Sequence, residues 1–144
     1  RRSDRILTVS EAVTRSALIR QYVQAAGVPD VKAVWAHEVG GSRLLLGVSI
    51  KQRYAGHSKQ AGLIASQCHA GAYVNRFVVV VDDDIDPADM DKVIWAMCTR
   101  CDPREGMEIL RGCWSSAREA PAPESRGRSL HGAAAVIYRG PALQ

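Results

Sequence analysis

Residues Val78 to Pro103, VVVVDDDIDPADMDKVIWAMCTRCDP, decide the fold of this chain. The five consecutive apolar residues from Phe77 to Val81 show no alternation, which is typical of a strand covered on both faces. Asp86 and Pro87 then predict the N-cap and the first position of a helix. The apolar face of that helix is expected to hold Met90, Val93, Ile94 and Met97. A buried strand that leads directly into a capped helix is typical of α/β proteins.

The N-terminal third of the chain predicts one helix and a pair of strands. Thr8 and Glu11 form a capping-box signal for a helix from about Ser10 to Ala26. Two apolar runs follow, from Val31 to Val39 and from Arg43 to Ile50, and a glycine turn separates them. Two such runs joined by a glycine turn favour antiparallel pairing.

The remaining segments complete the predicted domain. A buried helix is expected from His57 to about Tyr73, and a short strand from Met107 to Leu110. The order of helices and strands favours an α/β fold in which helices flank a mixed β-sheet. We expect this layered domain to occupy residues 1–114, and residues 115–144, which are rich in Ala, Pro, Ser, Gly and Arg, to form a loop-rich tail with a role in dimer contacts.

The composition is that of an ordinary globular protein. The chain has 144 residues, of which 47% are apolar and 24% charged, and this length suits one domain. No apolar run is long enough for a membrane span, and no signal peptide is visible, so a cytoplasmic location is expected. The net charge of +4 comes from basic residues interleaved with acids, which argues against nucleic acid as a partner. Because the chain begins at Arg1, we expect it to be a piece of a longer protein.

The cysteines and acids do not predict a metal site. Zinc sites of the knuckle type need two cysteine pairs, and only Cys98 and Cys101 have that spacing. Buried free thiols are the simpler interpretation of all the cysteines. The acid run from Asp82 to Asp86 lacks the glycine and glutamate of an EF-hand loop, and it is interpreted as strand termination and helix capping, with a ligand site at the strand end as the alternative.

Motifs that would indicate a self-sufficient active site are absent from the sequence. There is no nucleophile elbow, no phosphate-binding glycine loop and no clustering of the four histidines. Lys51 follows an apolar strand, where a lysine is commonly a solvated strand end but can also present its charge to a phosphate.

Three sequence blocks resemble the C-terminal region of UbiD-type decarboxylases. They are VSIKQRYAGHSK from Val48 to Lys59, RFVVVVDDDID from Arg76 to Asp86, and VIWAMCTRCDP from Val93 to Pro103. The resemblance implies a domain that drives oligomerisation and covers the substrate of an enzyme that uses prenylated FMN, a divalent metal (manganese) and potassium. Such enzymes remove or add CO2 on aromatic or α,β-unsaturated carboxylic acids, and a flavin prenyltransferase supplies their cofactor.

The resemblance also assigns roles to three residues of this chain. Lys51 is similar to a family lysine that reaches the flavin phosphate, and Met97 and Ala55 correspond to positions that line the substrate pocket. The catalytic Glu-Arg-Glu residues of the family lie in an N-terminal split barrel that this sequence does not contain. The chain alone is therefore expected to be inactive, to bind no cofactor by itself, and to form a homodimer or higher homo-oligomer.

An alternative function remains open from the sequence. The chain could be a non-catalytic α/β interaction or scaffold module, or an accessory subunit that completes a separate partner. The gene would separate the two hypotheses, because an upstream barrel with Glu-Arg-Glu supports the decarboxylase and a start codon near Arg1 supports the module.

Overall fold

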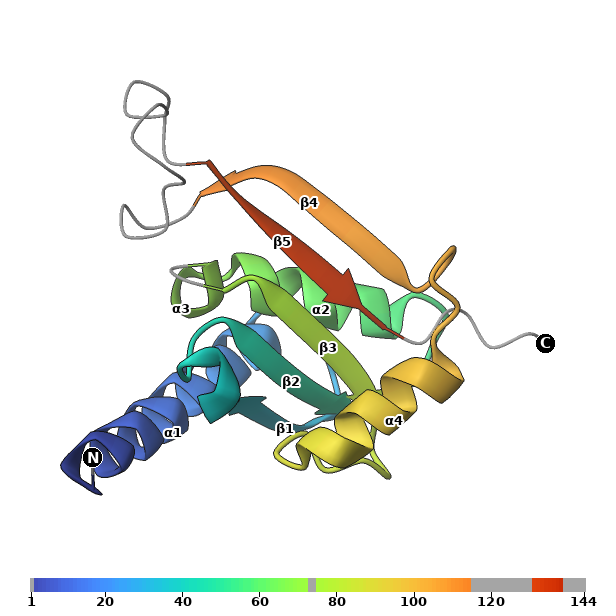
Figure 1. Ribbon diagram of the computed structural model, residues 1–144. Helices are drawn as coiled ribbons and strands as arrows, with labels where there is room; N and C mark the ends of the chain where they lie inside the picture. Colours follow the sequence, from blue (N-terminus) through green and yellow to red (C-terminus); the bar gives the residue numbers. More distant parts are fainter. Residues whose placement is uncertain (1, 73–74, 115–130, 139–144) are drawn as a thin grey trace.

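The computed structural model describes residues 2–72, 75–114 and 131–138, which form one mixed sheet with helices on both faces (Figure 1). In chain order the elements are α1 (Arg2–Ala25), β1 (Val31–Ala36), the 3-10 turn η1 (Glu38–Gly40), β2 (Leu45–Ile50), α2 (His57–Gln67), α3 (His69–Ala72), β3 (Phe77–Asp82), α4 (Met90–Arg100), β4 (Met107–Trp114) and β5 (His131–Ile137). The predicted α/β class with a mixed sheet is confirmed. Among the described residues, no helix combines the length and apolar character needed to cross a membrane.

The sheet has the strand order β1-β2-β3-β5-β4. β1 and β2 pair antiparallel, with Val34 opposite Val48, which confirms the predicted pair. β2, β3 and β5 run parallel to one another, whereas β4 is antiparallel to β5. The carboxyl ends of the three parallel central strands therefore lie at the same edge of the sheet.

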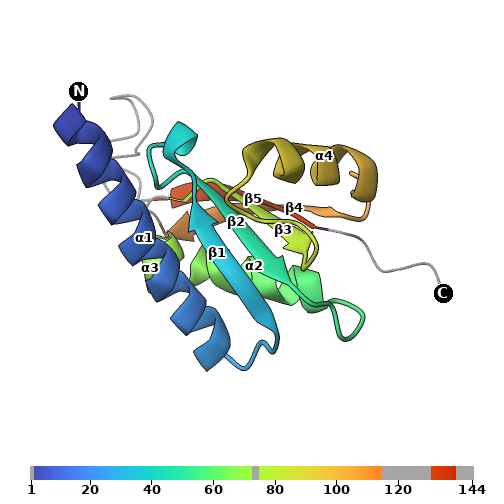
Figure 2. The ribbon, with the colours of Figure 1, turned by 90° about the horizontal axis from the view of Figure 1, so that it is seen from below.

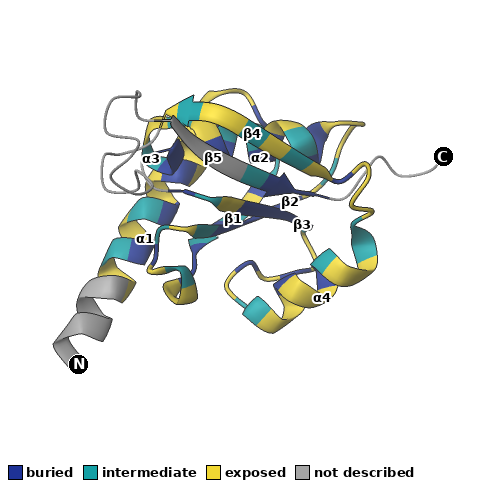
Figure 3. Cartoon of the chain, turned by 45° about the horizontal axis from the view of Figure 1, so that its top comes forward, coloured by how far each residue is buried: buried dark blue, intermediate teal, exposed yellow. Residues whose placement is uncertain are grey.

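Both faces of β3 are covered, as its unbroken apolar run predicts. Val78 and Val80 pack into a core cluster with residues of α1 and α2, whereas Val79 and Val81 pack into a second cluster with residues of α4. Figure 2 shows α1, α2 and α3 on one side of the sheet and α4 on the other. Burial is concentrated in the central strands and on the sheet-facing sides of the helices (Figure 3).

The helix α2 approaches the sheet unusually closely at Gly62. A Cβ atom at this position would lie 3.0 Å from Cγ2 of Val80 and still closer to Cγ1 of Val136. Only glycine leaves room for this approach, because each of these valines is stiff about its first side-chain torsion.

The start of α4 differs from the prediction. The helix begins at Met90 and not after Asp86, and its N-cap is Asp89, whose carboxylate accepts a hydrogen bond from the backbone N–H of Lys92 at 3.2 Å. Asp86 instead accepts from the N–H of Ala88 at 2.9 Å and so closes a turn before the helix. The predicted apolar face is also wrong at one position, because Ile94 is exposed and Ala96 takes its place beside Val93 in the core.

Three other predicted boundaries are corrected by the structure. The first helix already begins at Arg2, β1 ends at Ala36 because η1 follows it, and the long helix predicted after His57 breaks at Cys68. Cys68 has an extended backbone with ψ 155°, which separates α2 from the short α3.

The tail prediction is wrong for His131–Ile137. These residues form β5, a strand in the interior of the sheet between β3 and β4. Val136 has no exposed surface and Ile137 is 8% exposed, so β5 contributes to both core clusters. Its partner β4 is longer than predicted and reaches Trp114 through an irregularity between Leu110 and Cys113. The rest of the predicted loops, 115–130 and 139–144, lies outside the described residues.

Candidate functional site

The carboxyl edge of the parallel strands collects the polar residues most suited to ligand binding. Ile50 at the end of β2 lies opposite Asp82 at the end of β3, so Lys51 and the acid run emerge beside each other. Tyr138 follows β5 at the same edge. Ligands of open α/β sheets tend to bind outside the carboxyl ends of strands, which makes this edge the candidate site.

Lys51 stands at this edge with an exposed side chain. Its backbone N–H donates to the carbonyl oxygen of Asp30 at 3.0 Å, which fixes the main chain where β2 ends. Within the described part of the chain, its ammonium group has no ion-pair partner. A lysine with a fixed backbone and an unengaged charge can offer a point contact to a phosphate or carboxylate.

Arg53, two residues further on, is engaged with a carboxylate. Its Nε donates to Oδ2 of Asp30, and Lys32 lies 3.5 Å from the same carboxyl group. The hydrogen bond from Arg53 is the main reason that the pKa of Asp30 lies below its ordinary value. The same bond raises the pKa of Arg53.

Ala55 lies exposed in the loop that Lys51 begins. The next residue, Gly56, has φ +81°, a conformation that glycine adopts without strain. The Tyr54 ring before it stacks on the ring of His57, with centroids 4.5 Å apart, and its hydroxyl donates to Gln60. The structure thus places two of the predicted site residues, Lys51 and Ala55, in one short loop, 51–56.

The acid run is held by Arg100 at the end of α4. Its Nη1 atom donates to Asp82 at 3.0 Å, and its two terminal nitrogens contact both oxygens of Asp84 at 2.8 and 2.7 Å. The guanidinium carbon also lies 5.2 Å from the centre of the Trp95 ring. The hydrogen bonds to Asp84 are the main reason that the pKa of Arg100 is raised. This fork joins the end of α4 to the end of β3.

Across the described residues, no three His, Cys, Asp or Glu side chains come together in a way that could hold a metal ion. Asp82 and Asp84 form ion pairs with Arg100 instead. The four cysteines are free, but the expectation that they are buried is wrong, because Cys98 is exposed and Cys68, Cys101 and Cys113 are only partly covered. Burial raises the pKa of Cys68 and of Cys101, which makes these two thiols poor nucleophiles.

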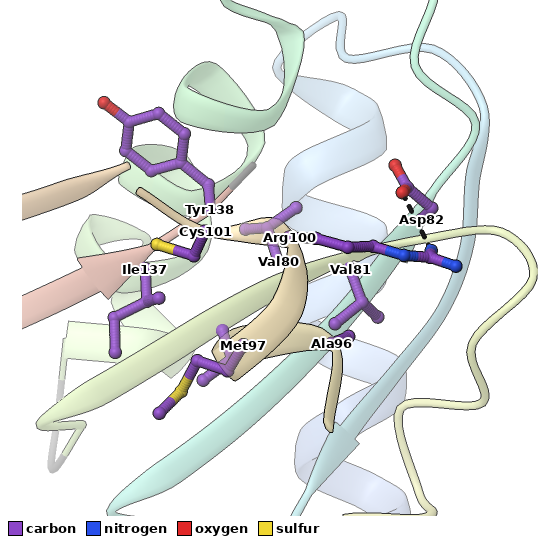
Figure 4. Close-up of a pocket in the computed structure, with 10 residues that line it drawn as sticks. Val80, Val81, Asp82, Ala96, Met97, Arg100, Cys101, Ile137 and Tyr138 are labelled. Carbon is purple, nitrogen blue, oxygen red and sulfur yellow. Dashed lines mark hydrogen bonds and ion pairs between the residues drawn. The ribbon is translucent and has the colours of Figure 1, made fainter. Parts of the chain in front are cut away.

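Met97 occupies a different place from the other predicted site residues. It is half-buried on α4 and packs against the second core cluster. Beside it lies a cavity of about 20 Å³ between α4, β3 and β5, with Ala96, Arg100 and Cys101 also in its wall (Figure 4). A cavity of that size holds about one water molecule and no organic acid. Neither Lys51 nor Ala55 lines it.

Tyr138, Glu108 and Lys59 form a polar cluster that the sequence did not reveal. Tyr138 is 5% exposed and its hydroxyl donates to Oε1 of Glu108 at 3.1 Å, while Lys59 forms an ion pair with the same oxygen. Burial is the main reason that the pKa of Tyr138 is raised, and the hydrogen bond from Lys59 lowers the pKa of Glu108. The cluster links α2, β4 and the end of β5, which are distant in sequence.

The comparison with protein families gives one match over most of the chain. A family described as the 3-octaprenyl-4-hydroxybenzoate carboxy-lyase C-terminal domain, UbiD_C, matches residues 9–137. The match includes Lys51, Ala55 and Met97, and it extends through β5.

Solved structures with the same fold come from UbiD-class enzymes and related decarboxylases. HmfF from Pelotomaculum thermopropionicum, a UbiD-class enzyme in complex with FMN, is 29% identical with a TM-score of 0.75, over 90% of this chain and 27% of that chain. The 3,4-dihydroxybenzoic acid decarboxylase of Enterobacter cloacae is 26% identical with a TM-score of 0.77, over 94% of this chain and 29% of that chain. The corresponding Klebsiella pneumoniae enzyme is 25% identical with a TM-score of 0.76, over 91% and 28%. The chain spans less than a third of the length of each of these proteins.

Proposed function

This chain belongs to the family of UbiD C-terminal domains, and from that premise we propose that it oligomerises and covers the substrate in a prenylated-FMN-dependent (de)carboxylase. The parent enzyme acts on an aromatic or α,β-unsaturated carboxylic acid. The observation that carries the proposal is the exposed Lys51, which has no ion-pair partner among the described residues. It lies at the shared carboxyl edge of β2, β3 and β5, within a family match that covers residues 9–137.

Lys51 is the residue that contacts the cofactor in this proposal. Its ammonium group binds the flavin phosphate, far from the carbon at which CO2 is exchanged, and so contributes to retention of the cofactor and not to the chemistry. The neighbouring cations support this assignment, because Arg53 and Arg100 are already paired with aspartates. The flavin, when bound, supplies the chemistry that stabilises charge on the substrate. The catalytic glutamates and arginine, and the ligands of manganese and potassium, are assigned to the N-terminal barrel of the parent.

Ala55 and Met97 line the substrate pocket in this proposal. The loop 51–56 carries Ala55 as an exposed residue with a small side chain. Met97 contributes a flexible thioether from α4, which can adapt to acids of different shape. Since the cavity beside Met97 is about 20 Å³, most of the pocket wall belongs to the rest of the parent protein.

The proposal is tested by substituting Lys51 with alanine in the full-length parent. A charge-assisted hydrogen bond contributes roughly 1.5–3 kcal/mol, so the dissociation constant for FMN should rise about 10- to 100-fold. Selectivity among substrates should change little, because the phosphate is distant from the reacting carbon. Lys92→Ala is the matched control, since Lys92 is also exposed and, within the described residues, forms an ion pair with its neighbour Asp89. Unchanged flavin retention in Lys51→Ala, measured by fluorescence on dilution, would contradict the proposal.

A further inference from the structure

We propose that His57 and the Pro29–Asp30 turn are positioning residues for the loop 51–56, and that they act on a bound phosphate through Lys51. This inference deepens the proposed function and rests on it. The loop joins the end of β2 to the start of α2, whereas the turn after α1 is distant in sequence and meets them only in the folded chain.

His57 joins the loop to the turn with both of its ring nitrogens. Nδ1 accepts a hydrogen bond from the backbone N–H of Arg53 at 3.1 Å. Because Nδ1 is an acceptor, Nε2 carries the proton and donates to the carbonyl oxygen of Pro29 at 2.9 Å. The residue has no exposed surface, and the Tyr54 ring covers one face of its imidazole. A buried imidazole with both nitrogens hydrogen-bonded has a single orientation, so it holds the backbone of Arg53 against the Pro29 carbonyl.

Asp30 holds the loop at its first and third residues. Its carbonyl oxygen accepts from the N–H of Lys51 at 3.0 Å, and its carboxylate pairs with the side chain of Arg53. Asp30 has φ +54°, a conformation uncommon outside glycine but tolerated by aspartate and asparagine. In this conformation Asp30 accepts from the loop with both its backbone carbonyl and its carboxylate.

These contacts bear on ligand binding because the side chain of Lys51 is long and flexible. A lysine gives a strong contact only when its backbone is already in place, since otherwise binding must also order the loop. The Pro29–Asp30 turn and His57 provide that order before the ligand arrives. Arg53 contributes its backbone and its side chain to the anchoring, so of the two cations in this loop Lys51 is the one without an ion-pair partner among the described residues.

Two substitutions loosen the loop in different ways. In His57→Gln, the side-chain amide can still donate to Pro29, but no acceptor remains at the position of Nδ1 for the N–H of Arg53. In Asp30→Asn, the left-handed backbone is tolerated and the carbonyl contact to Lys51 is kept, while the charge that pairs with Arg53 is removed. Asp30 is not buried in the core, so this second variant keeps the test valid if His57→Gln fails to fold.

The first arm of the test uses this chain alone and no cofactor. Hydrogen exchange of the backbone amides from 51 to 56 should accelerate about tenfold or more in His57→Gln, while the amides of β3 stay protected. Unchanged exchange in this loop would overturn the inference without touching the proposed function.

The second arm measures the dissociation constant of FMN in the full-length protein. It compares His57→Gln, Asp30→Asn, Lys51→Ala and the double variant that combines His57→Gln with Lys51→Ala. We expect each positioning variant to bind about 3- to 10-fold more weakly. The double variant should bind no more weakly than Lys51→Ala, because His57 acts through that lysine. Additive losses, or normal binding in both positioning variants when Lys51→Ala is impaired, would overturn the inference alone. Normal binding in Lys51→Ala would overturn the proposed function, and the inference with it.

Discussion

Replacing Gly62 with alanine tests how closely α2 must pack on the sheet. The added Cβ would lie 3.0 Å from Cγ2 of Val80 and closer still to Cγ1 of Val136, nearer than real Cβ atoms approach. Val136 has no exposed surface and Val80 is 4% exposed, so neither side chain has room to move. The helix must shift away from the sheet, or a valine must leave its preferred rotamer.

Two opposing effects set the magnitude. Overpacking a core costs about 1–3 kcal/mol, and the short approach to Val136 places Gly62→Ala near the upper limit. Alanine is a better helix former than glycine by about 1 kcal/mol, which acts in the opposite direction. The free energy of unfolding should therefore fall by about 2 kcal/mol. In a chain of this size such a loss lowers the melting temperature by roughly 6–8 °C.

The assay is urea unfolding followed by circular dichroism, together with thermal melts. The urea concentration at the midpoint of unfolding should fall. The slope of the unfolding free energy against urea concentration should stay the same, since the same surface is exposed on unfolding. Val136→Ala is the matched control. Combined with Gly62→Ala, it makes room for the new methyl group, so the double variant should lose about 1 kcal/mol less than the sum of the two single losses. A Gly62→Ala variant as stable as the original chain, or strictly additive losses, would refute the reasoning about this contact.

The other predictions concern the parent enzyme and the assembly of the chain. The chain alone, incubated with prenylated FMN and a panel of aryl and α,β-unsaturated acids, should release no CO2, because the proposal assigns the catalytic Glu-Arg-Glu residues to the barrel of the parent. Release above background would contradict this. In the parent, Met97→Phe should narrow the substrate range toward smaller or flatter acids, because the stiffer ring has only about 20 Å³ of adjacent space. If Met97 is only a core residue, the melting temperature falls and the ratio of kcat/KM for a small and a bulky acid stays the same. The chain should form a homodimer, since exposed apolar side chains such as Trp114 and Ile109 lie on the edge strand β4. Light scattering after size exclusion would exclude the dimer if the mass stayed near 15.6 kDa at every concentration.

The sequence predicted the position of a site residue only where neighbouring residues determine that position. Lys51 was placed at a strand end because the apolar run before it is visible, and β2 does end at Ile50. The roles of Lys51, Ala55 and Met97 stay predictions. Asp30 and His57 escaped notice because nothing in their immediate neighbours shows that Asp30 meets Lys51, or that His57 meets Pro29, across the fold. Arg100 escaped notice as well, because the aspartates that it holds lie 16 and 18 residues earlier in the chain.

The sequence by itself determined the α/β class, the burial of β3 on both faces and the antiparallel pairing of β1 with β2. Each follows from local signals: the order of the predicted helices and strands, an apolar run without alternation, and a glycine turn between two apolar runs. Only the tertiary structure decided that His131–Ile137 is an interior strand. Its alanine-rich sequence has weak intrinsic strand preference. It becomes a strand because β3 and β4 offer hydrogen bonds on both sides and because Val136 and Ile137 pack into the two core clusters. The same long-range packing brings the Pro29–Asp30 turn to His57, a meeting that no local pattern encodes.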